Sequence, residues 1–210
     1  MDLGFGTEYE KFVLRRIAAN LVNTLAIRSV CQYPANALLG RGSDIFEKSF
    51  ATQSYSEYPQ DPVRKYDLVW NFCELEKTDN PSQLLTKMLN LSRSYVFIIT
   101  QNNRNIGVHL HRLYHLLGGR PWDHGRVSHM SLATIEEVVR HSERKCKVVR
   151  RGYFDAPWFI LDIYEAGTFL RKLVPESAIG TNDMRQSRFE SYPDRTKSWL
   201  AHHCYALIKC

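Results

Sequence analysis

The sequence lacks any long apolar run. Its strongly apolar segments, such as YVFIIT at 95–100, have the length of a β-strand, whereas a helix that spans a bilayer needs about 20 apolar residues. The first residues, MDLGFGTEYEKF, include acidic side chains and no apolar core, which argues against a secretory signal peptide. These absences predict a cytoplasmic protein with no membrane segment.

Short motifs of metal ribbons and nucleotide sites are also missing. The five cysteines are scattered and odd in number, and no CxxC pair occurs, so neither a zinc ribbon nor a redox motif is predicted. We expect reduced, mostly buried thiols. The sequence has neither a GxxxxGKS phosphate loop nor a GxGxxG turn, which counts against a nucleotide-binding protein.

The excess of positive charge is modest. The chain has 210 residues, of which 44% are hydrophobic and 24% charged, and this composition is typical of a globular protein with a sizeable core. A formal net charge of +6 attracts anionic partners. The densest basic cluster, RHSERKCKVVRR at 140–151, is shorter than the basic stripe with interleaved aromatics that nucleic-acid binding favours. Nucleic-acid binding is therefore an alternative that the sequence does not favour.

The apolar periodicity predicts alternating helices and strands. Val13, Ile17 and Leu21 recur at helical spacing, while YDLVWNFC at 66–73 is nearly continuously apolar, as expected for a buried parallel strand. The expected strands are 27–33, 66–73, 95–100, 145–154 and 202–210. The expected helices are 8–26, 35–50, 82–92, 106–119, 131–143 and 162–177, and Ser131 is expected to cap the helix at 131–143.

This alternation predicts one α/β domain over residues 1–210, with a mostly parallel sheet flanked by helices. The polar segments 51–65 and 185–197 are predicted to be irregular. An insertion at about 153–200 separates the last two strands, which we expect to close one edge of the sheet.

The segment 66–105 carries a resemblance to a known family. Asp67 lies in a strand of the form fDlV, Glu74 or Glu76 follows in a short loop, and Asn80-Pro81 precedes a leucine-rich helix. A strand and a polar turn come next. This order of features resembles the centre of the class I S-adenosylmethionine-dependent methyltransferases, of the type 11/12-like group.

Two further segments resemble parts of that family. WDHGRVSHMSLATIEEVVR at 122–140 is similar to its histidine-containing loop and penultimate helix, and the end of the chain is similar to its last strand. The resemblance covers about residues 8–50, 66–152 and 200–210. It implies a Rossmann-like sheet with an antiparallel last strand, S-adenosylmethionine as cofactor, and a small-molecule or protein side chain as methyl acceptor.

Candidate ligand-binding residues follow the strands. In open parallel α/β sheets, ligands bind beyond the carboxyl ends of the strands, near the point where the strand order switches. After the third strand the candidates are Thr100, Gln101 and Asn102. Those that the resemblance associates with the cofactor are Gln32, Tyr33, Pro34, Ala35 and Asn36 after the first strand, and Asn71, Phe72, Cys73 and Glu74 after the second.

The sequence departs from the family pattern in two places. The family's E-x-G-x-G-x-G turn lets the backbone approach the ligand, but here Gln32 replaces the acid, and Pro34 and Ala35 replace glycines. Residues 49–65 are also too few for the usual strand, helix and strand that carry the ribose-binding carboxylate. We therefore expect a sheet shortened at one edge. The alternative function is a catalytically inactive, methyltransferase-like binding or scaffolding protein.

The histidines suggest two kinds of chemistry. His111 and His115 lie four residues apart on one helix face and can share a metal, but no acidic or cysteine ligand has a supporting spacing, so no metal site is predicted. His124, in the loop that resembles the family's active-site rim, is a candidate general base. The GYFDAPWF segment around Phe154 and Trp158 can line an acceptor pocket, although a packed corner is the favoured interpretation.

Overall fold

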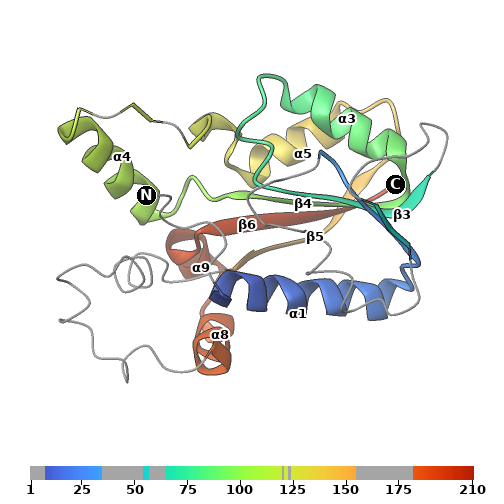
Figure 1. The fold of residues 1–210 in the computed structure, drawn as a ribbon, viewed down its shortest axis with the longest axis horizontal. Coiled ribbons are helices and arrows are strands. Elements are labelled where there is room, and N and C mark those ends of the chain that lie inside the picture. Colours follow the sequence, from blue (N-terminus) through green and yellow to red (C-terminus); the bar gives the residue numbers. More distant parts are fainter. Residues whose placement is uncertain (1–7, 35–53, 57–64, 120, 123, 155–181) are drawn as a thin grey trace.

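A six-stranded sheet forms the centre of the protein (Figure 1). The computed structural model describes residues 8–34, 54–56, 65–119, 121–122, 124–154 and 182–210. In spatial order, the strands are β2 (Ser54–Ser56), β1 (Ser29–Gln32), β3 (Tyr66–Phe72), β4 (Ser92–Gln101), β6 (His203–Lys209) and β5 (Lys147–Phe154). β2, β1, β3 and β4 pair in parallel, and β6 is antiparallel to both neighbours. The predicted α/β fold class with an antiparallel last strand is confirmed.

Helices cover both faces of the sheet. α3 and α5 lie on one face and α1 lies on the other, while α4 extends beyond the sheet from the end of β4 (Figure 1). The bounds of the described α-helices are α1 (Glu8–Leu25), α3 (Pro81–Leu91), α4 (Ile106–Leu117), α5 (Leu132–Arg140), α8 (Asn182–Ser191) and α9 (Asp194–Leu200). A 3-10 turn, Val127–His129, precedes α5.

β3 is buried on both faces of the sheet, which accounts for its almost continuously apolar sequence. Leu68, Trp70 and Phe72 are buried in the core that includes α1, whereas Val69 is buried in the core that includes α3 and α5. Side chains of a strand alternate between the two faces. A strand that is covered on both faces therefore needs apolar residues at consecutive positions.

The amino ends of α3 and α5 have side-chain caps. The Gln83 backbone N–H donates to Asn80 Oδ1 at 2.9 Å, and Pro81 occupies the first turn, where its missing N–H costs no helical hydrogen bond. The Thr134 N–H donates to Ser131 Oγ at 3.1 Å. The expected cap at Ser131 is thus confirmed, and α5 begins where the sequence indicates.

Ser131→Ala is expected to lower the free energy of unfolding by about 1 kcal/mol, because the Thr134 N–H loses its acceptor at the start of α5. Urea denaturation followed by circular dichroism measures this change. Ser128→Ala, at an exposed position in the preceding turn, is the control and should leave stability nearly unchanged. An equal effect of the two substitutions would contradict the capping role.

Two polar segments are more regular than predicted. Within 51–65, which was expected to be a loop, Ser54–Ser56 forms β2 because the free edge of β1 supplies parallel hydrogen-bonding partners. Within 185–197, the chain forms α8 and α9. The sequence of α8 is mostly polar, which is why no helix was predicted there, and among its described side chains Gln186 and Phe189 lie one turn apart and are both buried.

The remaining predictions concern the edge of the sheet and two helices expected in parts of the chain that the structure does not describe. The three-residue β2 is the outermost described strand at its edge, where a shortened sheet was predicted. The helices expected at 35–50 and 162–177 lie outside the described residues. The one-domain organisation and the insertion at about 153–200 stay predictions. Among the described helices, none combines the length and the apolar character required to cross a bilayer.

Candidate functional site

The carboxyl ends of β1 and β3 lie side by side at the point where the strand order switches. The chain passes from β1 outward to β2 on one side and then to β3 on the other. The Tyr33 N–H donates to the Trp70 carbonyl at 2.9 Å, and the Cys73 N–H donates to the Ile99 carbonyl at 2.9 Å. The loops after β1 and β3 therefore leave the sheet together, in the position where open α/β sheets bind ligands.

A pocket of about 230 Å³ opens at this position. Three of the nine predicted cofactor-binding residues line it: Tyr33, Pro34 and Glu74. The other residues in its wall come from the loop after β3 and from α3, and are Lys77, Thr78, Gln83, Leu84 and Lys87. The pocket thus combines one carboxylate with two lysines.

Glu74 is the acidic side chain of this pocket. Its carboxylate forms an ion pair with Lys77, with Oε1 and Nζ 3.1 Å apart. Burial raises the pKa of Glu74, and the positive charge of Lys77 opposes this rise. The ion pair holds the carboxylate at the mouth of the pocket.

Of the other six predicted cofactor-binding residues, four are buried in the protein and do not line the pocket, and two lie outside the described residues. Gln32, Asn71, Phe72 and Cys73 are all buried. Asn71 Nδ2 lies 3.3 Å from Met88 Sδ of α3, so its amide points toward the helix. Ala35 and Asn36 lie outside the described residues.

Glu76 is a buried carboxylate that joins three segments of the chain. Its side chain accepts a hydrogen bond from Thr100 Oγ1 at 2.8 Å and from the Gln101 N–H at 3.2 Å. Its own backbone carbonyl accepts from the Arg126 N–H at 2.7 Å. Burial raises the pKa of the Glu76 carboxyl group. Of the two acids considered from the sequence, Glu74 therefore faces the pocket, whereas Glu76 connects the loop after β3 to the end of β4.

Three histidines gather at the outer side of this edge. His111 and His115 lie one turn apart on α4, and the loop after α4 brings His124 between them. The ring centroid of His124 lies 4.7 Å from that of His111 and 5.2 Å from that of His115. The sequence analysis found no third metal ligand at a supporting spacing. That reasoning considered acidic and cysteine ligands, whereas the third candidate in the fold is a histidine of the loop, which lies close to the other two only in the folded chain.

Comparison with known proteins identifies the architecture. No protein-family sequence model matches the chain, and no curated protein matches it by sequence. A magnesium protoporphyrin IX methyltransferase from Synechocystis PCC 6803 with bound SAH (S-adenosylhomocysteine) superposes with a TM-score of 0.53 and 10% identity, covering 96% of this chain and 83% of that one. The plantazolicin methyltransferase BpumL in complex with SAH gives 0.50 and 13%, covering 96% and 84%. The fold is that of the class I S-adenosylmethionine-dependent methyltransferases.

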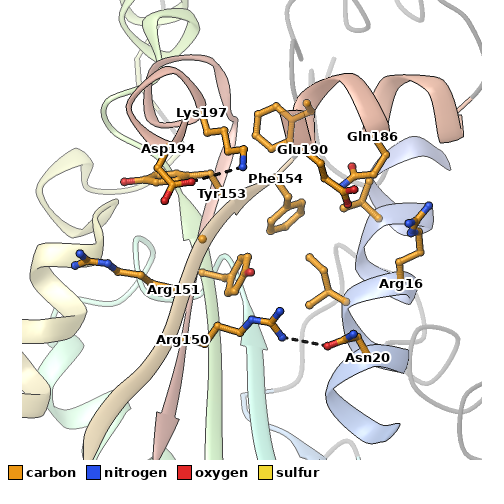
Figure 2. Close-up of a pocket in the computed structure, with 15 residues that line it drawn as sticks. Arg16, Asn20, Arg150, Arg151, Tyr153, Phe154, Gln186, Glu190, Asp194 and Lys197 are labelled. Carbon is orange, nitrogen blue, oxygen red and sulfur yellow. Dashed lines mark hydrogen bonds and ion pairs between the residues drawn. The ribbon is translucent and has the colours of Figure 1, made fainter. Parts of the chain in front are cut away.

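A second cavity lies on the α1 side of the sheet, shown in Figure 2. It measures about 410 Å³ and lies between α1, β5, α8 and α9. Arg150 donates to Asn20 Oδ1 at 3.1 Å, and Lys197 lies 3.5 Å from Asp194 (Figure 2). Of the predicted cofactor-binding residues that the structure describes, none lines this cavity.

Two adjacent histidines at the start of β6 were not among the candidates proposed from the sequence. His202 and His203 are buried, and His203 stacks on Phe154 and lies beside Phe72, with ring centroids 5.1 Å apart in both pairs. Register places His203 opposite Gln101, at the carboxyl edge. The signal in the sequence was the HH pair that opens the last strand. Trp158 lies outside the described residues.

Proposed function

We propose that this chain binds S-adenosylmethionine and transfers its methyl group to a small-molecule or protein acceptor. One observation carries the proposal: the pocket lined by Tyr33, Pro34 and Glu74 opens between β1 and β3, at the switch point of a methyltransferase fold. Structures of the two neighbouring methyltransferases contain SAH, the product form of this cofactor, which supports the same ligand class here.

The pocket residues supply binding rather than covalent chemistry. When bound, S-adenosylmethionine provides a methyl group that its sulfonium already activates, so the protein has to orient the reactants and exclude water. The pocket carries one carboxylate, which is paired with Lys77, and a second lysine, so it can complement both positive and negative groups of a ligand. At about 230 Å³ the pocket is smaller than the roughly 300–1,000 Å³ of typical ligand sites. We therefore assign the described residues one part of the cofactor site.

The acceptor site is proposed at the same edge of the sheet. A cavity of about 680 Å³ lies against the residues that follow β4, including Asn102 and Arg104, and against Tyr153 of β5. Trp199 of α9 contributes an aromatic wall. This polar lining with one aromatic side fits a polar acceptor. Catalysis by His124 as a general base stays a prediction.

Calorimetric titration with S-adenosylmethionine and SAH tests the proposal. We expect micromolar binding to the full chain, weakened about tenfold or more by Glu74→Ala, because the pocket loses its carboxylate. Glu137→Ala, at an exposed position of α5, is the matched control and should bind like the unaltered chain. Circular dichroism confirms that each variant is folded. No binding at millimolar ligand would overturn the proposal and favour the binding or scaffolding alternative.

A further inference from the structure

We propose that His111, His115 and His124 form a binding site for a divalent transition-metal ion, with zinc as the best match. Each residue offers one ring nitrogen, and the three ligand atoms lie within 4.8 Å of one another. In a tetrahedral zinc site, Zn–N distances near 2.05 Å place neighbouring ligand nitrogens about 3.3 Å apart. The Nε2 atoms of His111 and His115 are 3.1 Å apart, close to this separation.

A backbone hydrogen bond prepares His115 for metal binding. Its Nδ1 lies 2.8 Å from the Pro121 carbonyl, which can only accept, so Nδ1 carries the proton. In the neutral ring the lone pair then resides on Nε2, the atom that faces His111. Histidine ligands in metal sites commonly donate their second ring N–H to a backbone carbonyl in this way, which fixes the tautomer and the ring orientation.

The loop that carries His124 is attached to the sheet edge. Trp122 Nε1 donates to the Gly125 carbonyl at 2.7 Å, so the indole is tied to the residue that follows His124. The Arg126 N–H donates to the Glu76 carbonyl at 2.7 Å. These contacts hold the third candidate ligand against α4, as a preorganised site requires.

The indole ring of Trp122 lies beside all three histidines of the cluster. The Trp122 ring lies edge-on to all three imidazoles, with centroid distances of 5.7 Å to His111, 5.6 Å to His115 and 4.8 Å to His124. The Arg112 guanidinium lies 5.9 Å from the centre of the same indole ring. The imidazoles are partly buried beside this ring, which limits access of water from one side.

The donor set selects the class of metal. Three imidazoles suit zinc, copper or nickel, whereas magnesium and calcium require oxygen ligands. Three protein ligands also leave a fourth tetrahedral position for water or a bound molecule. The site is separate from the pocket of Tyr33, Pro34 and Glu74 in its lining residues, and its existence does not depend on the proposed methyl transfer.

Calorimetric titration of the untagged, chelator-treated full chain with Zn²⁺ tests this proposal, in the absence of S-adenosylmethionine. We expect one ion per chain with a Kd in the micromolar range or below. Each of His111→Ala, His115→Ala and His124→Ala should weaken binding on the order of 100-fold. His109→Ala is the matched control, because it removes an exposed histidine from the same helix and should leave the affinity unchanged.

Co²⁺ absorption provides a second readout that distinguishes a built site from surface binding. A bound four-coordinate ion should give intense visible bands that His124→Ala abolishes and His109→Ala retains. No Zn²⁺ binding at millimolar concentration would overturn the proposal. Binding that survives substitution of all three histidines would also overturn it. Because metal binding is measured without the cofactor, failure of either proposal leaves the other standing.

Discussion

Glu76→Ala is expected to lower the free energy of unfolding by about 2–4 kcal/mol, because it leaves two buried donors without their acceptor and creates a cavity. Those donors are the Thr100 hydroxyl and the Gln101 N–H, at 2.8 and 3.2 Å from the carboxylate oxygens. Urea denaturation at constant pH measures the change. A loss below about 0.5 kcal/mol, which is usual for surface substitutions, would contradict the buried connecting role.

Glu76→Gln separates the hydrogen bonds from the ionisation. The amide can donate to Thr100 and accept from Gln101, so we expect most of the stability to be retained. Burial raises the pKa of Glu76 above its ordinary value of 4.5, which means that the folded chain binds this proton more tightly than the unfolded chain. The stability contributed by the neutral form is therefore present below pH 4.5 and lost as pH rises through the raised pKa.

A pH series of unfolding measurements tests that sign. As pH rises above 4.5, the unaltered chain should lose stability relative to Glu76→Gln, which cannot ionise at this position. Parallel stability profiles for the two proteins would show that burial of Glu76 does not perturb its ionisation. Every other titrating residue is common to both chains, but the substitution also removes the negative charge that helps to raise the pKa of Glu74.

Gly125→Ala is expected to cost about 1–3 kcal/mol and to weaken metal binding, because the loop that carries His124 has to move. Gly125 has a φ of 90°, and a Cβ added there would lie 2.6 Å from the Glu76 carbonyl oxygen. The obstacle is backbone, so a side-chain rotation cannot relieve it. Thermal unfolding and Zn²⁺ titration measure the two effects.

Gly119→Ala is the matched control for this prediction. Gly119 also has a positive φ, 62°, but an added Cβ meets no heavy atom of the described part of the chain within 4 Å. This variant should therefore cost only the left-handed backbone penalty, about 1 kcal/mol, and should keep the metal affinity of the unaltered chain. Equal metal affinity in both glycine variants would show that close docking of the loop on Glu76 does not position His124.

The segment after β3 connects the two proposed sites. Glu74 lines the pocket at the switch point, while the Glu76 backbone carbonyl holds the loop that carries His124. Only one residue separates these two acids in the chain. Substitutions in this segment can therefore affect both sites, which is why Glu74→Ala is compared with a distant control and the metal site is tested through its own histidines.

Local patterns were enough to predict much of the fold. The continuous apolar run at 66–73 indicated a buried parallel strand, and Ser131 indicated the start of a helix, because periodicity and capping depend on neighbouring residues alone. Extending the strand-end rule to the loops after β1 and β3 also pointed to Tyr33 and Glu74.

Tertiary structure decided the features that join distant segments. Nothing local distinguishes Glu74 from Glu76, yet one faces a pocket and the other is buried against the end of β4. Likewise, His124 is nine residues from His115 and becomes a candidate ligand because Gly125 allows its loop to pack against Glu76. Sequence by itself determined most of the strands and helices, although not β2, α8 and α9, which lie in polar segments. Contacts between loops decided which polar side chains meet, because such contacts depend on how the sheet edge is assembled.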